Sequence, residues 1–151
     1  MIDDTILSQM ASSLIAGKYN LFLGSGVSLD SSNSGGKLPS ASKLRDELCS
    51  LKGVHKTSSL QRVFSTLTYH ERQTHVIDRF KSCTPGATLI KLREFNWKRV
   101  FTLNIDDALE SAYALPKARQ EAVPIHFNQD YVEERETHSA CALLFSGRHS
   151  I

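Results

Sequence analysis

The sequence predicts an α/β fold in which helices flank a parallel sheet. Two short apolar segments, 19–23 and 99–103, are rich in strand-forming residues. Each is followed by a polar corner and then by a helical pattern, which is the order expected of a parallel sheet. Ligands of such sheets bind beyond the carboxyl ends of the strands, so we expect both corners to face one crevice.

Size and composition fit one globular domain spanning residues 1–151. The chain has 40% hydrophobic and 23% charged residues, with a formal net charge of +2. Basic residues are dispersed among acidic ones, and we interpret the cluster of Lys91, Arg93, Lys98 and Arg99 as a solvated face rather than a nucleic-acid site. The N-terminus lacks a basic secretory signal and no apolar run approaches a membrane span, so we expect a cytoplasmic protein without membrane attachment.

The three cysteines predict no metal site. Cys49, Cys83 and Cys141 are odd in number, widely separated, and lack CxxC spacing. This pattern indicates neither a disulfide framework nor a four-cysteine zinc site, and buried thiols are expected instead.

The first part of the chain predicts a helix and then a central strand. Residues 4–16 place Ile6, Met10 and Leu14 on one stripe, and Gly17 follows as a stop signal. The segment 19–23 is too short for a buried helix, so we interpret it as a central strand ending at Gly24.

The middle of the chain is predicted to be helical. After a polar, glycine-rich loop over 31–39, Ser40 begins a helical pattern in which Leu44, Leu48 and Leu51 recur. Apolar spacing over 58–81 favours two helices. The segment Thr84-Pro85-Gly86 then breaks the chain before a short helix over 87–95.

The last third gives the second corner and an unfinished sheet. Strand 99–103 is followed by Asn104, Asp106 and Asp107, then by a helical segment over 108–115. Residues 125–127 are a short strand candidate, and 141–146 is the approach to a third strand. A doubly wound sheet needs further strands after this point, so we expect a fragment truncated from a larger protein, with a terminus changed by an altered reading frame as the alternative.

The first corner has the composition of a phosphate-binding turn. Gly24 and Gly26 lack a Cβ, which allows a sharp bend and lets a diphosphate approach the backbone amides, while Ser28 adds a hydroxyl. Leu29 occupies the last position of the dinucleotide fingerprint GxGxxG, so the motif is incomplete. A tight turn without a ligand is the alternative.

The second corner, TLNIDD, has two interpretations. Asn104 or Asp106 caps the following helix, or both contribute to a binding site. Two strand ends that offer backbone amides on one side and an amide with a carboxylate on the other could together hold a dinucleotide.

The segments FLGSGVS, LPSASKLRDEL and WKRVFTLNIDDALESAY together resemble the sirtuin-like domain of bacterial NAD-hydrolysing proteins, many of which are bacteriophage-defence effectors. The resemblance spans residues 5–115. It depends on a GxGxS turn and a T-x-N-x-D strand end with Trp97 just upstream.

The resemblance implies a Rossmann-like, sirtuin-like fold and a role for each matching residue. Gly24, Ser25, Gly26 and Ser28 would hold the NAD diphosphate. Asn104 would position the water or hydroxyl that reacts at the nicotinamide ribose, and Asp106 would accept a hydrogen bond from the carboxamide. Thr102 and Ile105 would shape the pocket wall. NAD is then the substrate, and no metal is predicted.

The resemblance also implies a catalytic histidine in a leucine-histidine-glycine strand, which this sequence lacks. His126, His138 and His149 follow Asn104, and none is followed by glycine, so we name no catalytic base.

Three functions remain open from the sequence. The first is hydrolysis of the nicotinamide–ribose bond by an antiviral-defence effector that acts with a C-terminal sensor domain, a partner protein or as a homo-oligomer. The second is NAD-dependent protein deacylation, although the cysteine-paired zinc module of deacylating sirtuins is missing here. The third is a non-catalytic sensor of NAD or ADP-ribose.

Overall fold

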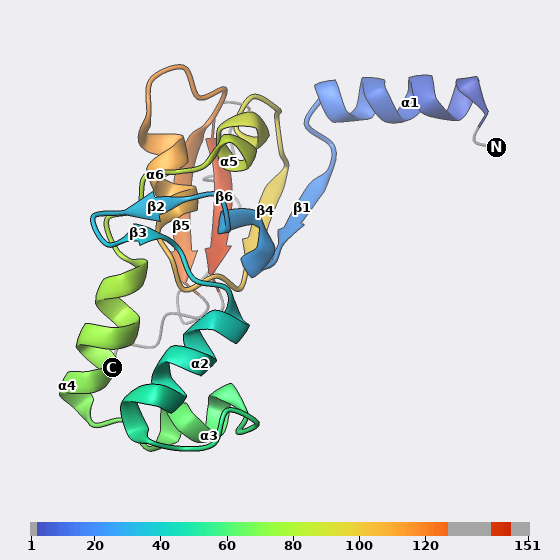
Figure 1. The fold of residues 1–151 in the computed structure, drawn as a ribbon. Helices are drawn as coiled ribbons and strands as arrows, with labels where there is room; N and C mark the ends of the chain where they lie inside the picture. Colours follow the sequence, from blue (N-terminus) through green and yellow to red (C-terminus); the bar gives the residue numbers. More distant parts are fainter. Residues whose placement is uncertain (1–2, 127–139, 146–151) are drawn as a thin grey trace.

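A four-stranded parallel sheet forms the centre of the protein. The structure is a computed structural model that describes residues 3–126 and 140–145. Strands β1 (Asn20–Leu23), β4 (Arg99–Thr102), β6 (Ala140–Phe145) and β5 (Glu121–His126) lie side by side in that order, and every pair is parallel. The predicted mixed α/β class with parallel strand pairing is therefore confirmed (Figure 1).

Strand β1 lies at the edge of the sheet, so its prediction as a central strand is wrong. The neighbour of β1 is β4, and their register pairs Phe22 with Phe101 and Leu23 with Thr102. Leu21 and Leu23 turn toward the core, whereas Phe22 is 73% exposed and stacks on Phe101 with ring centroids 4.6 Å apart. A four-residue apolar run looks the same in sequence whether one or both of its faces are covered.

The first helix, α1 (Asp4–Ile15), confirms the predicted segment but is not packed on the core. The Asp3 carboxylate caps its first turn by accepting from the Thr5 amide, and Gly17 follows the helix at φ +65°. None of its residues is buried. Figure 1 shows α1 projecting away from the body at the β1 side of the sheet.

A short turn and a small hairpin connect β1 to α2. The 3₁₀ turn η1 (Ser25–Ser28) follows β1, and within the predicted loop β2 (Ser32–Asn33) and β3 (Gly36–Lys37) pair antiparallel. Helix α2 (Ala41–Lys52) begins as predicted, because the Ser40 hydroxyl accepts from the Lys43 amide. Leu44 and Leu48 are buried, whereas Leu51 is 44% exposed and does not belong to the core stripe.

The two helices predicted over 58–81 are present, and the second is irregular. Helix α3 (Leu60–Ser65) is followed by α4 (Tyr69–Arg72), which continues through a π turn, η2 (Gln73–Ile77), and a 3₁₀ turn, η3 (Asp78–Phe80). Thr68 and Glu71 form a reciprocal capping box at the start of α4. Hydrogen bonds from the Thr68 amide and the Lys52 ammonium lower the pKa of Glu71 to about 2.

Helices α5 (Ala87–Leu92) and α6 (Ala108–Ala114) lie against one face of the sheet (Figure 1). They form the main core with residues of β4 and the helices beyond the strand ends: Leu44, Leu48, Val63, Leu89, Val100, Leu109 and Ala112. The start of α5 packs so closely on Asp30 that a side chain at Gly86 would collide with the Asp30 carboxyl group and backbone. Asp30 in turn accepts hydrogen bonds from the Thr88 amide and hydroxyl.

The last two strands, β5 and β6, include most of the two segments that the sequence predicted, and β5 begins earlier than predicted. The candidate at 125–127 is the end of a six-residue strand, β5, which includes Pro124. Proline is tolerated there because β5 lies at the other edge of the sheet. The segment expected as a third strand is β6, which lies between β4 and β5. Among the described residues, no helix has both the length and the apolar character needed to cross a membrane.

Candidate functional site

The two polar corners of the sequence meet at the carboxyl ends of β1 and β4. Because these strands are neighbours with Leu23 opposite Thr102, the segments that follow them begin side by side. Turn η1 follows β1, and the loop 103–107 connects β4 to α6. Ser28 on the first segment and Asn104 and Asp106 on the second are each at least 95% buried.

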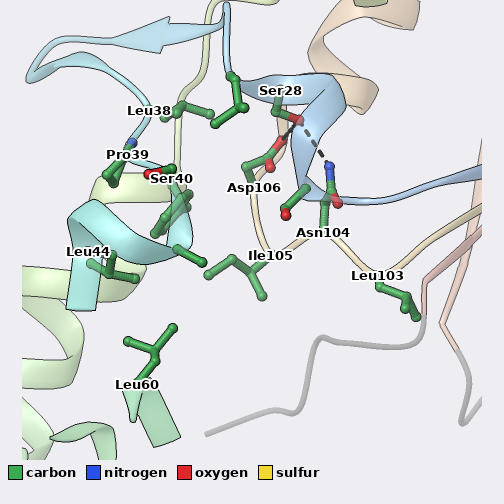
Figure 2. A pocket seen from close by; sticks show the side chains of 14 residues that line it. Ser28, Leu38, Pro39, Ser40, Leu44, Leu60, Leu103, Asn104, Ile105 and Asp106 are labelled. Carbon is green, nitrogen blue, oxygen red and sulfur yellow. Dashed lines mark hydrogen bonds between the residues drawn. The ribbon is translucent and has the colours of Figure 1, made fainter. Parts of the chain in front are cut away.

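Ser28 joins the two corners through its hydroxyl group. The Ser28 Oγ donates to Asp106 Oδ1 at 2.9 Å and accepts from Asn104 Nδ2 at 3.0 Å (Figure 2). The Asp106 Oδ1 also accepts from the Ala108 amide at 3.2 Å, at the first residue of α6. Asp106 therefore contributes to the start of the helix, in agreement with the capping interpretation of the second corner, and the same oxygen is bonded to Ser28.

This hydrogen-bond chain fixes the orientation of the Asn104 amide. The ionised Asp106 carboxylate can only accept hydrogen bonds, so the Ser28 hydroxyl uses its single O–H to donate to Asp106. The Ser28 oxygen must therefore accept from its other neighbour. That neighbour is the amide nitrogen of Asn104, and the Asn104 Oδ1 is left buried without a partner among the described residues. A buried unpaired acceptor at this position is suited to a ligand hydroxyl or water that donates a hydrogen bond.

The buried carboxylate of Asp106 is electrostatically unusual. Burial raises its pKa above the ordinary value of 3.8, and the hydrogen bonds from Ser28 and Ala108 partly oppose that rise. Both of these hydrogen bonds end on Oδ1, and neither uses Oδ2. The site therefore combines one negative charge with one neutral acceptor.

A cavity of about 210 Å³ lies beside these groups. Ser25, Ser28, Asn104 and Asp106 form its polar end, and Figure 2 shows Ile105 extending from the same loop toward α2. Its remaining walls are mostly apolar side chains from the β3–α2 segment, α2, α3 and η3, among them Leu38, Pro39, Leu44, Leu60 and Phe80. The volume suits one ring or sugar and is smaller than the pockets that enclose whole drug-sized ligands.

The glycine corner lies outside this cavity. Gly24, Ser25 and Gly26 are exposed at the start of η1, and of the three only Ser25 lines the cavity wall. Neither glycine has a positive φ, and an added Cβ would meet no atom within 4 Å at either position. The sharp bend expected to need glycine is therefore absent, because η1 turns with ordinary backbone angles.

Two residues that hold the site in place were not singled out from the sequence. The Asp107 carboxylate accepts from the Ser82 and Cys83 amides at 2.7 and 2.9 Å, which ties the end of η3 to the start of α6. The buried Gln120 side chain accepts from the Trp97 amide and donates to the Trp97 carbonyl, just before β4. The second acid of the TLNIDD motif was the only sequence signal for either of them.

Other predicted site residues have different positions. Thr102 is buried and its Oγ1 accepts from the Asn104 amide, but it does not line the cavity. Cys49 and Cys83 are buried free thiols, as expected. His138 and His149 lie outside the described residues, as do the side chains of His126 and Cys141. Within the described part, no three His, Cys, Asp or Glu residues gather as metal ligands would.

Comparison with known proteins does not assign the chain to a family. No family model matches the sequence, and no curated protein matches it significantly.

Proposed function

We propose that this chain is the NAD-binding part of a Rossmann-like, sirtuin-like domain that hydrolyses the bond between nicotinamide and ribose. The observation that carries the proposal is the Ser28 hydroxyl, which links Asn104 and Asp106 beside one cavity at the carboxyl ends of adjacent parallel strands. Ligands of open parallel sheets bind at such strand ends. The parallel pairing of the strands in the order β1-β4-β6-β5 also supports a Rossmann-like assignment.

The dimensions of the site suit one end of a dinucleotide. A cavity of about 210 Å³ has room for a nicotinamide ring. The rest of NAD would lie over the exposed turn at Gly24, Ser25 and Gly26. Without side chains at the two glycines, phosphate oxygens can approach the backbone closely. The unfilled space at both glycines supports this placement.

The chemistry requires positioning more than strong acid–base groups. Nicotinamide leaves NAD as a neutral molecule, and the ribose acquires oxocarbenium-like positive charge. Asp106 offers a nearby negative charge and an acceptor for the carboxamide, and the free Oδ1 of Asn104 orients the attacking water or ribose hydroxyl. Holding these reactants together can lower the barrier by roughly 7–11 kcal/mol in favourable cases.

Binding without turnover is the second candidate. Its specific support is that no histidine is among the residues described as lining the cavity, although a histidine normally acts as base in the domains that the sequence resembles. A chain with the phosphate turn and the Ser28 link but without that base would sense NAD or ADP-ribose and signal to a partner.

Cleavage of etheno-NAD, followed by fluorescence, tests these candidates. Hydrolysis predicts turnover that Asn104→Ala abolishes, while the matched control Asn20→Ala, at an exposed residue of β1, keeps it. A sensor predicts that calorimetry detects ADP-ribose binding without turnover. Nicotinamide release that depends on an acetylated peptide would support deacylation instead. Absence of both binding and turnover in the folded chain would overturn the proposed function.

A further inference from the structure

Helix α1 carries an apolar stripe that the described part of its own chain does not cover. Ile6, Leu7 and Met10 are each close to half exposed, and no residue of the helix is buried. The spacing of Ile6, Met10 and Leu14 places them on one face, which is the pattern of a helix that packs against another surface. A contiguous exposed apolar surface of this kind typically marks an interaction site.

A second uncovered apolar surface lies on the sheet beside α1. Phe22 and Phe101 stack on the face of the sheet opposite the core residues Leu21, Leu23 and Val100; Phe22 is 73% exposed and Phe101 is partly exposed. No described helix covers these two rings. Parallel sheets are normally covered on both faces, whereas the described helices of this chain pack on one face of this part of the sheet.

The connection between α1 and β1 prevents the helix from folding back over its own sheet. The amides of Ala16, Gly17 and Lys18 donate to carbonyls in the last turn of α1 at 3.0 Å each, and Gly17 adopts φ +65°. Asn96 fixes the outside of this corner. Its Nδ2 donates to the Ile15 carbonyl at 3.4 Å, and its Cβ would lie 3.2 Å from a Cβ at Gly17. Moving α1 onto its own Phe22 would break these contacts.

We propose that α1 docks on the Phe22–Phe101 surface of a second copy of this chain, and that the two copies exchange helices reciprocally. Both surfaces lie at the β1 edge of the molecule, and α1 projects beyond that edge, so a copy facing it is within reach (Figure 1). One chain supplies both halves of the contact, as a two-fold interface requires. The proposal does not depend on the proposed NAD chemistry.

The size of the exchange is compatible with a concentration-dependent dimer. A helix of 12 residues is about 18 Å long and about 10 Å wide, so its outline on a sheet is about 180 Å². The accessible surface buried on each side is on the order of 250 Å², and the two symmetric contacts together bury on the order of 1,000 Å². This area is at the lower end of the range of specific protein interfaces.

Light scattering during size-exclusion chromatography of the full chain, over a range of concentrations, tests the dimer. Met10→Glu and Phe22→Glu should each raise the dimer dissociation constant on the order of 100-fold, because each change occurs twice in the interface. Ser8→Glu adds the same charge to the opposite face of α1 and should leave the dimer intact. Ser8, Met10 and Phe22 all have exposed side chains, so the three glutamate variants are expected to fold, and circular dichroism checks this.

Disulfide trapping distinguishes exchange from intrachain docking. When Met10→Cys and Phe22→Cys proteins are mixed and oxidised, mass spectrometry should identify a peptide that joins the two positions from different chains. Ser8→Cys mixed with Phe22→Cys is the matched control and should give no such product. A monomer at every concentration, a dimer unaffected by both glutamate variants, or the absence of an interchain peptide that joins positions 10 and 22 would each overturn the proposal.

Discussion

Ser28 Oγ lies 3.0 Å from Asn104 Nδ2, although the two residues are 76 positions apart in the sequence. The Ser28 hydroxyl also donates to Asp106, so this one group is the acceptor for the Asn104 amide nitrogen and a donor for the Asp106 carboxylate. An alanine at this position cannot donate to Asp106 or accept from Asn104. It would leave a buried carboxylate short of a donor and a buried amide short of an acceptor.

Ser28→Ala should therefore lower the free energy of unfolding by about 1–3 kcal/mol, which is the range for leaving buried polar groups unpaired. Urea unfolding followed by circular dichroism measures this change. Ser25→Ala is the matched control, because Ser25 is an exposed serine of the same turn and should change stability by less than about 0.5 kcal/mol. Equal urea midpoints for the two variants would show that the Ser28 link contributes nothing to stability.

The sequence was sufficient for the helices and for the convergence of the two corners, but not for the order of the strands. Ser40 and the leucine spacing after it predicted the start of α2, because capping and periodicity are local properties. The edge position of β1 depends on which strands pair, and Phe22 in a short apolar run carries no signal of its exposure. Asp107 reaches the amides of Ser82 and Cys83, more than 20 residues away, through tertiary packing.

The raised pKa of Asp106 has a defined effect on stability. Burial raises the pKa in the folded chain above the ordinary value of 3.8, so the folded state binds this proton more tightly than the unfolded state does. Ionised Asp106 therefore costs stability, and this cost grows as pH rises from about 3.8 through the folded pKa, then levels off.

Asp106→Asn removes the charge and keeps an oxygen that accepts from Ser28 and Ala108. Its free energy of unfolding relative to the parent chain should increase with pH over that window. The difference between the two proteins cancels the opposite trend from Glu71, whose pKa is lowered to about 2. Urea unfolding at a series of pH values measures the difference, and a difference that shrinks as pH rises would contradict the burial of the ionised carboxylate.

Two glycine substitutions separate a fold requirement from a ligand requirement. Gly86→Ala should destabilise the chain by about 1–3 kcal/mol, because the new methyl group would overlap Asp30 and force α5 to move.

Gly26→Ala should leave stability within about 0.5 kcal/mol, because the site for its Cβ is empty and its φ is not positive. Under the proposed function, the same Gly26→Ala methyl group would obstruct the diphosphate and weaken NAD binding at unchanged stability. Thermal unfolding and calorimetry with NAD provide the two readouts, and unaltered NAD affinity would remove the turn from the binding site.

Cys83 should resist alkylation in the folded protein. Burial, together with the neighbouring Asp107 carboxylate, raises the pKa of its thiol to about 12, so the reactive thiolate is nearly absent at neutral pH. Iodoacetamide at pH 7.5 should label Cys83 rapidly in urea and only slowly without it, which peptide mass spectrometry can quantify.

Asp107→Asn removes the negative charge and keeps one oxygen as an acceptor for the Ser82 or Cys83 amide. Because burial is the larger cause of the shift, this variant should accelerate native labelling far less than urea does. If Cys83 in Asp107→Asn were labelled as fast as in the unfolded chain, burial of the sulfur would not be the cause of the protection. The protection would then depend on the hydrogen bonds from the Ser82 and Cys83 amides to Asp107.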